Sequence, residues 1–187
     1  MTIIASAFIL IGGKSKRFGS PKWKAHFNGK PILDNIWNAC DSFENRFVIG
    51  KEKPNGIMKP FVQDELEINA PINGLYTALR HSTSDWILLV SCDLPLLEPR
   101  VFENLWSAKS NKCKAIVPIA NEKTQVTCGY YNKQILPTVE NEINKQNYSI
   151  MKLLEKISVS FVEFGDDNRF INMNTPNDYN KLLSLNH

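Results

Sequence analysis

Residues 3–22 read IIASAFILIGGKSKRFGSPK, and this segment is the most informative about the fold class. Its first part, as far as Ile11, is apolar on both faces of an extended chain, which is typical of a parallel sheet covered by helices. The second part, from Gly12 to Lys22, mixes glycines with four cations, Lys14, Lys16, Arg17 and Lys22. A buried strand that leads into a glycine-rich basic loop predicts an α/β protein with an anion site at the end of that strand.

The rest of the chain alternates between apolar runs that predict strands and amphipathic patterns that predict helices. Further strands are expected at 47–49, 58–63, 86–91, 115–119, 125–131 and 159–164. Amphipathic patterns predict helices beginning at Pro31, near Leu75 and over 100–108, 134–144 and 150–154. A last helix should begin at Thr175-Pro176-Asn177-Asp178, with Thr175 as N-cap, proline at the first position and a carboxylate three residues after the cap. We expect a three-layer, doubly wound α/β fold with a mostly parallel, mixed sheet, formed by 1–187 as a single domain.

The composition excludes several classes of protein. The chain has 187 residues, 43% of them hydrophobic, which argues against low-complexity disorder. A net charge of +3, well mixed along the sequence, is too small to predict a nucleic-acid surface. The apolar start has no basic region before it, and no apolar run approaches the ~20 residues of a membrane helix. Four scattered cysteines fit thiols in a reducing compartment, so we expect a cytoplasmic protein that binds neither nucleic acid nor membrane.

Three polar segments follow predicted strands, at 12–22, 64–74 and 92–95. Ligands of open parallel sheets bind beyond the carboxyl ends of the strands, so these segments predict one shared site. The glycine-rich loop matches neither the P-loop nor the dinucleotide fingerprint, and a flexible basic surface loop is the alternative interpretation. Asp93, directly after a buried strand, suits Mg²⁺ bound between protein and phosphate oxygens, or else caps the following turn.

Five motifs recur in an order that resembles a known family. They are Leu10-Ile11-Gly12-Gly13, Arg17-Phe18-Gly19-Ser20-Pro21-Lys22, Pro71-Ile72-Asn73-Gly74-Leu75, Cys92-Asp93-Leu94-Pro95 and Asn172-Met173-Asn174-Thr175-Pro176-Asn177-Asp178. Over nearly its whole length the chain resembles the bacterial molybdenum cofactor guanylyltransferases, within the α/β nucleotidyltransferases of Rossmann-like fold. The resemblance implies transfer of GMP from Mg-GTP to the terminal phosphate of molybdopterin or the molybdenum cofactor, with release of pyrophosphate.

The same resemblance implies roles for individual residues. On the nucleotide side, Leu10, Gly12 and Gly13 would cradle the guanine nucleotide, and Asp64 would touch its nucleoside. Lys22 and Arg17 would bind phosphates, and Asp93 would hold Mg²⁺ near GTP, which makes these three the catalytic candidates. Asn172 and Asn174 would face the pterin. The reaction needs cations rather than a strong base, because the attacking phosphate is already ionised at neutral pH.

Three positions depart from the family pattern. Pro21, Gly50 and Ala70 stand where family members usually carry Asp, Asn and Gly. Gly12-Gly13, in place of the Ala-Gly of cytidylyl relatives, favours GTP. The alternatives are a relative that uses CTP or another phosphorylated acceptor, and a non-catalytic carrier of nucleotide or pterin. Proteins that insert the cofactor or mature molybdoenzymes are candidate partners.

Overall fold

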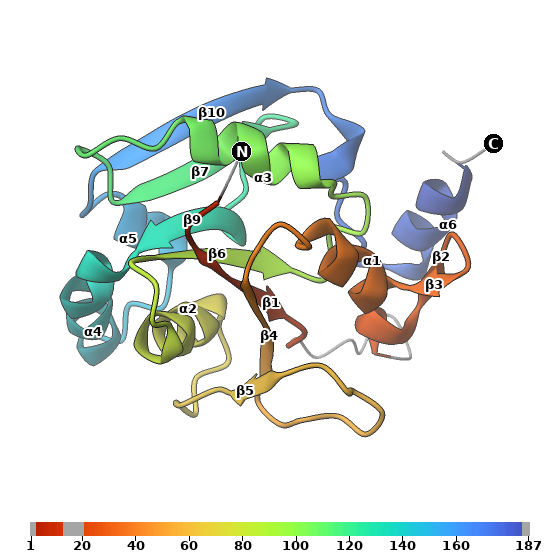
Figure 1. Cartoon of the computed structure of the whole chain (residues 1–187), viewed down its shortest axis with the longest axis horizontal. Helices are drawn as coiled ribbons and strands as arrows, with labels where there is room; N and C mark the ends of the chain where they lie inside the picture. Colours follow the sequence, from red (N-terminus) through yellow and green to blue (C-terminus); the bar gives the residue numbers. More distant parts are fainter. Residues whose placement is uncertain (1–2, 13–20, 185–187) are drawn as a thin grey trace.

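The sheet is the centre of the structure. A computed structural model describes residues 3–12 and 21–184, and within them eight strands form one sheet in the order β10-β7-β9-β6-β1-β4-β5, with β8 beside β7 (Figure 1). The strands are β1 (Ser6–Leu10), β4 (Asn45–Gly50), β5 (Phe61–Gln63), β6 (Trp86–Ser91), β7 (Ala115–Ala120), β8 (Lys123–Thr124), β9 (Cys128–Asn132) and β10 (Val159–Gly165).

Strand direction makes the sheet mixed but mostly parallel, as predicted. β5, β4, β1 and β6 are parallel neighbours, and β10 is parallel to β7. β9 lies between β6 and β7 and runs antiparallel to both. The carboxyl ends of β5, β4, β1 and β6 therefore lie along one edge of the sheet.

Helices cover both faces of the sheet. Alternate residues of β1 point to opposite sides: Ala7 and Ile9 belong to one apolar cluster, Phe8 and Leu10 to the other. The first cluster includes side chains from α1 (Ile32–Ala39), α3 (Pro99–Ser107) and α6 (Pro176–Ser184). The second includes side chains from α2 (Pro71–His81), α4 (Leu136–Asn144) and α5 (Ile150–Leu154). The three-layer α/β prediction is confirmed.

A small hairpin was missed from the sequence. β2 (His26–Phe27) and β3 (Lys30–Pro31) pair antiparallel around Asn28 and Gly29, both of which have positive φ. An Asn-Gly pair is the usual sequence of such a two-residue turn, so the signal was present. The hairpin also corrects the start of α1, because Pro31 precedes the helix as its N-cap rather than occupying its first position.

Short 3-10 turns complete the chain: η1 (Lys22–Lys24), η2 (Lys133–Ile135) and η3 (Asn168–Phe170). The strand expected over 125–131 is extended only from Cys128 onward, in β9, because residues 125–127 form the turn that separates it from β8. Among the described residues, every helix is too short or too polar to cross a membrane.

Candidate active site

Backbone hydrogen bonds join the loops that leave the four parallel strands. The carbonyl of Leu10 accepts from Cys92 N at 2.9 Å, and Ile11 N donates to Ile49 O at 3.0 Å. On the other side, Asp64 N donates to Gly50 O at 2.9 Å. These bonds fix the backbone around Leu10, Asp64 and Asp93 at one edge, where three polar segments were expected to meet. Gly13 and Arg17 lie outside the described residues.

Two half-buried carboxylates at this edge each have one buried oxygen without a described partner. Asp64 Oδ1 and Asp93 Oδ1 are inaccessible and find no hydrogen-bond partner among the described residues. Burial raises the pKa of Asp64, and the Lys51 ammonium in part opposes that shift. An unsatisfied buried oxygen costs about 1–3 kcal/mol. Such an oxygen in a native fold indicates a ligand-binding role or stored strain.

Gly74, in the first turns of α2, allows Leu10 and Asp64 to approach the helix closely. A Cβ at Gly74 would lie 2.3 Å from Leu10 Cδ2 and 3.9 Å from Asp64 Oδ1. At Gly12, by contrast, an added Cβ meets no described atom within 4 Å, so the backbone there borders open space. A ligand could therefore approach the backbone at Gly12 while resting on the Leu10 side chain.

A polar stripe along α2 holds the loop that follows β5; it consists of Asn73, Thr77 and Arg80. The Asn73 amide accepts from Leu66 N at 3.2 Å and donates to the carbonyls of Leu66 and Ile68. Thr77 Oγ1 accepts from Glu65 N at 3.0 Å, and Arg80 Nε lies 2.8 Å from Glu65 Oε2. Sequence reasoning missed the stripe. Its only sequence signal is the spacing of polar residues at i, i+4 and i+7 in an otherwise apolar helix.

Segment 171–174, which follows β10 in the sequence, borders the site next to Asp93. Met173 N donates to Asp93 O at 2.8 Å, and Lys22 Nζ donates to Asn174 Oδ1 at 2.8 Å. The structure thus brings Lys22 and Asn174 together beside Asp93. Asn172 lies in the same segment and is half-buried.

The predicted capping motif fixes the end of this segment. Asp178 Oδ2 accepts from Asn174 N at 3.0 Å and from Thr175 N at 2.8 Å, while Asp178 N donates to Thr175 Oγ1 at 3.2 Å. The Thr175 hydroxyl contributes most to lowering the pKa of Asp178, and the backbone N–H groups of Thr175 and Asn174 lower it further. The N-terminus of α6 is confirmed as predicted.

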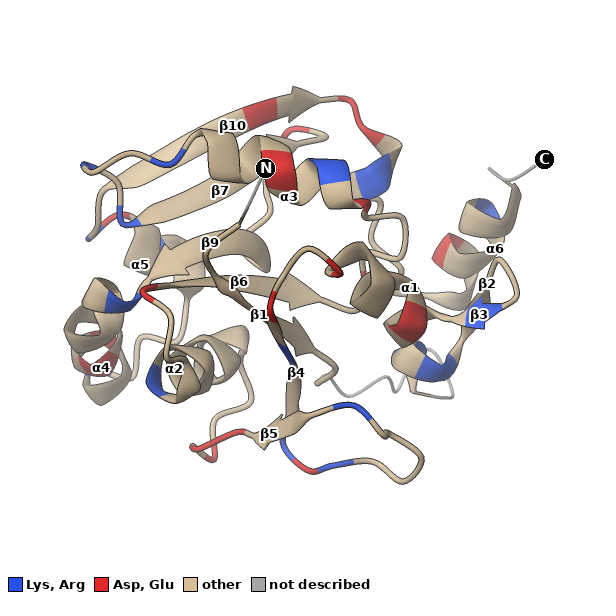
Figure 2. Cartoon of the chain, viewed as in Figure 1, with Lys and Arg blue, Asp and Glu red and all other residues tan. Residues whose placement is uncertain are grey.

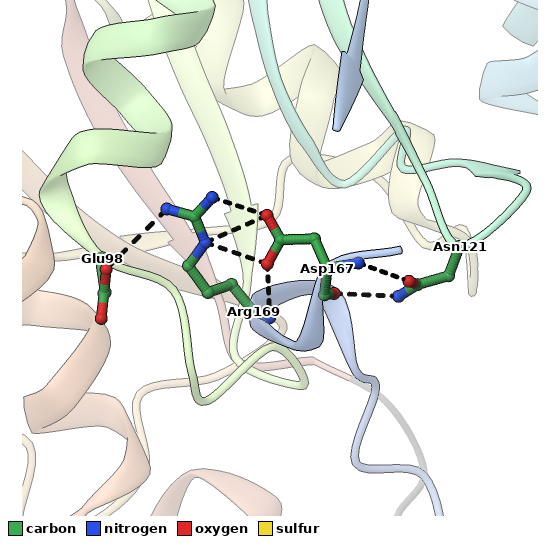
Figure 3. A network of polar contacts seen from close by, with 4 residues as sticks. All are labelled: Glu98, Asn121, Asp167 and Arg169. Atoms are coloured by element: carbon green, nitrogen blue, oxygen red, sulfur yellow. Dashed lines mark hydrogen bonds and ion pairs between the residues drawn. The ribbon is translucent and has the colours of Figure 1, made fainter. Parts of the chain in front are cut away.

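A second network holds the chain just before the segment (Figure 3). Asp167 Oδ2 accepts from Arg169 Nη2 at 2.6 Å, and Arg169 Nη1 lies 3.8 Å from Glu98 Oε2. Asn121 binds the backbone of Asp167 twice, donating to Asp167 O at 3.1 Å and accepting from Asp167 N at 2.9 Å. We call these four residues the Asp167 network. It ties the loop after β10 to the β7–β8 turn and to the N-terminus of α3.

The donor set fits a metal that is shared with a substrate. Among the described residues no group of three or more His, Cys, Asp or Glu side chains is placed to hold a metal ion. Mg²⁺ commonly binds one or two carboxylates and completes its shell with water and substrate phosphates. The unpartnered Asp93 Oδ1 suits that arrangement. The neighbouring Cys92 is no nucleophile: burial, reinforced by the Asp93 charge, raises the pKa of its thiol to about 12.

Basic and acidic residues are interspersed along the described helices, strands and loops (Figure 2). The loop between β4 and β5 carries Lys51, Lys53 and Lys59, of which Lys59 is paired with Asp34. Lys51 directly follows β4, and its charge acts on Asp64 at the site, although the chain as a whole carries only +3.

Comparison with known proteins identifies the family of the chain. Residues 7–160 match the sequence profile of the MobA-like NTP transferase domain. A protein of Aquifex aeolicus named "Probable molybdenum cofactor guanylyltransferase" is 33% identical, covering 97% of this chain and 92% of the relative. A protein of the same name in Flavobacterium johnsoniae is 29% identical, with 95% of each chain covered.

A solved structure has the same fold. Molybdopterin-guanine dinucleotide biosynthesis protein A of Archaeoglobus fulgidus superposes with a TM-score of 0.82 at 21% identity, covering 96% of this chain and 97% of that one. On the strength of the profile match and the Aquifex relative, the chain belongs to the MobA-like NTP transferase domain family and is a nucleotidyltransferase.

Proposed function

We propose that this chain transfers GMP from GTP, bound with Mg²⁺, to the terminal phosphate of molybdopterin or the molybdenum cofactor, releasing pyrophosphate. The observation that carries the proposal is the pair of buried carboxylate oxygens of Asp64 and Asp93 at the carboxyl edge of the sheet, which have no partner among the described residues. The Lys22–Asn174 pair adjoins Asp93, because Met173, next to Asn174, donates to the Asp93 carbonyl. The names of the relatives supply the substrates: those from Aquifex and Flavobacterium are both named for guanylyl transfer to the molybdenum cofactor.

In this proposal the nucleotide lies across the end of β1. Leu10, Gly12 and Gly13 cradle the guanosine moiety, and Asp64 accepts a hydrogen bond from it. Burial raises the pKa of Asp64, and its buried Oδ1 has no described partner, so a ligand N–H or O–H group would supply a donor that favours the charged carboxylate. Lys22 and Arg17 neutralise the phosphates; the assignments of Gly13 and Arg17 rest on the sequence alone.

Asp93 is the proposed ligand of Mg²⁺. The ion, when bound, would neutralise charge on the phosphates of GTP and on the departing pyrophosphate. The backbone of Asp93 is held in place, because its carbonyl accepts from Met173 N at 2.8 Å and its N–H contacts Ser91 Oγ at 3.4 Å. A carboxylate on a fixed backbone has less to reorganise while charge moves in the transition state.

Segment 171–174 is the proposed seat of the acceptor, through Asn172 and Asn174. An oxygen of the acceptor phosphate attacks the α-phosphorus of GTP and forms a new P–O bond. The bond from that phosphorus to the oxygen bridging to the β-phosphorus breaks, and pyrophosphate leaves with the electron pair. Lys22 lies against Asn174, so its ammonium can serve the donor phosphates beside the incoming acceptor. Proteins that receive the product for insertion into molybdoenzymes are proposed partners.

The test measures turnover for each combination of nucleotide and acceptor. Purified protein and Mg²⁺ are mixed with each of the four NTPs, with molybdopterin or molybdenum cofactor as acceptor, and both pyrophosphate and the dinucleotide product are measured. We expect release with GTP that depends on an acceptor. Preference for CTP, or turnover only with another phosphorylated acceptor, would redirect the proposal to a related transferase. No pyrophosphate with any NTP would overturn it.

A further inference from the structure

The polar stripe of α2 lies behind the nucleotide side of the site. Thr77 is 0% exposed and Asn73 1% exposed, so both polar groups are taken fully out of water. Their neighbours Leu75, Ala78 and Leu79 pack in the apolar cluster below the sheet. Burying a polar side chain is costly unless it is hydrogen-bonded, and an apolar residue could fill the same volume. Packing alone therefore does not explain why polar side chains occupy these buried positions of α2.

Among the described residues, the side-chain hydrogen bonds of the stripe all end on the loop that begins with Asp64. Thr77 binds the N–H of Glu65, the residue directly after Asp64, and Asn73 binds Leu66 and Ile68. On its other side, the N–H of Asp64 is bound to Gly50 O. The backbone of Asp64 is thus held by β4 on one side and by α2 on the other.

This restraint explains how Asp64 Oδ1 stays buried without a partner. A free loop would relax until water reached the oxygen, because an unsatisfied carboxylate oxygen is costly to bury. The hydrogen bonds from Asn73 and Thr77 and the Arg80–Glu65 ion pair oppose that relaxation. Binding that begins from a prearranged carboxylate loses less conformational entropy.

We propose that the polar stripe, and Thr77 above all, positions Asp64 for the nucleoside, so that nucleotide affinity depends on residues that touch no nucleotide. This inference rests on the proposed function, in which Asp64 contacts the nucleoside. Asn73, Thr77 and Arg80 are positioning residues, and they act through the peptide that follows Asp64.

The test is a double-mutant cycle on nucleotide binding. Affinity for GTP and for CTP, each with Mg²⁺, is measured by calorimetric titration for the wild type, Thr77→Val, Asp64→Asn and the double variant. Valine has the shape of threonine without the hydroxyl, so it leaves Glu65 N–H unpaired. We expect Thr77→Val to weaken the preferred nucleotide roughly tenfold, the loss of about one well-placed hydrogen bond. In the Asp64→Asn background, Thr77→Val should have little further effect.

Two further variants separate positioning from general stability. Thr77→Ser keeps the hydroxyl and should restore affinity to within about twofold. Ser82→Ala is the matched control: Ser82 is 3% exposed at the other end of α2, and its hydroxyl bonds the backbone of Ser84 instead. It should lower the unfolding temperature and leave affinity unchanged. In turnover, Thr77→Val should raise the KM for the nucleotide and leave kcat nearly constant.

The possible results separate a failure of this inference from a failure of the proposed function. Wild-type affinity in Thr77→Val, or equal losses with and without Asp64, would overturn it while leaving the proposed function intact. Normal binding by Asp64→Asn would overturn it too, together with the role given to Asp64. If the wild type binds no nucleotide, both proposals fail. Should Thr77→Val not fold, Arg80→Gln at a half-exposed position gives the same cycle, with an expected loss of about twofold.

Discussion

Four aspartates show how burial and partners separate structural from functional side chains. Asp167 and Asp178 accept several hydrogen bonds each, which hold the pKa of each carboxyl below its usual range. Asp64 and Asp93 each keep one buried oxygen without a described partner. The first pair stabilises loops near the site. The second pair carries a free-energy cost that a bound cation or ligand donor would relieve.

Replacing Asp93 by asparagine should separate activity from stability. Asp93→Asn keeps the shape of the side chain and removes the charge, so turnover should fall by roughly a hundredfold or more if it holds Mg²⁺. The unfolding temperature without ligands should stay equal or rise, because a buried amide costs less than a buried carboxylate. Pyrophosphate release and thermal unfolding measure the two effects. Near-normal turnover would show that the metal lies elsewhere.

Adding a methyl group at Gly74 should disturb the nucleotide side through Leu10. The new Cβ would lie 2.3 Å from Leu10 Cδ2, so the Leu10 side chain must move. The strain, typically about 1–3 kcal/mol, is partly offset by the better helix propensity of alanine, about 1 kcal/mol. Gly74→Ala should therefore fold, lose at most about 2 kcal/mol by denaturant unfolding, and bind nucleotide more weakly. Adding Leu10→Ala removes the clash, so the double variant should be no less stable than Leu10→Ala alone.

At the scale of elements, the site depends on loops that are tied to distant elements. The Asp167 network joins the loop after β10 to Asn121, 46 residues earlier, and to Glu98 beside α3. The polar stripe joins the loop after β5 to α2. Strands and helices therefore set the layers, while a few side-chain bonds to backbone groups set the loop positions.

The Asp167 network should make stability depend on pH in the acid range. Hydrogen bonds from Arg169 lower the pKa of Asp167 from its ordinary 3.8, so the carboxylate stabilises the fold above that pH. That contribution is lost as the pH falls through the lower, folded-state pKa. By denaturant unfolding, Asp167→Asn should be less stable than the wild type at pH 7, by about 1 kcal/mol. The two proteins should converge below pH 4, and a constant gap down to pH 2 would contradict the assignment.

The sequence predicted the elements better than their connections. Apolar runs such as 86–91 identify buried strands locally, and Thr175 and Asp178 form a cap within four residues, so both were predictable. The reversed direction of β9 and the Asp167 network depend on contacts between residues far apart in the sequence, which no local pattern encodes. The Asn28-Gly29 turn is different, because its signal was local and was overlooked.

In the complete fold, the antiparallel direction of β9 has the largest effect on where the proposed site forms. Because β9 is antiparallel to both neighbours, β7 and β10 run in the same direction as β6. The chain therefore leaves β10 toward the edge where Asp93 lies, and segment 171–174 reaches it within a few residues. Strand direction therefore brings both halves of the proposed site to the same edge of the sheet.

Nucleotide binding should stabilise the entire fold and should need magnesium to do so fully. A ligand that binds only the folded protein raises its stability by about 2.7 kcal/mol at one hundred times Kd. GTP with Mg²⁺ should therefore raise the unfolding temperature more than GTP with EDTA. In Asp93→Asn the magnesium-dependent part of the shift should vanish while a smaller shift with GTP alone remains. An equal response to magnesium in both proteins would argue against Asp93 as the ligand.

The hydrogen bond from Met173 to Asp93 also bears on the order of events during synthesis. Segment 171–174 is translated after every strand of the sheet, since β10 ends at Gly165. Chains begin to fold from the N-terminal side as they emerge from the ribosome. The edge with Asp64 and Asp93 can thus assemble on a nascent chain before segment 171–174 arrives to close it. If the proposed function holds, a growing chain would complete the nucleotide half of its site before the half that accepts the second substrate.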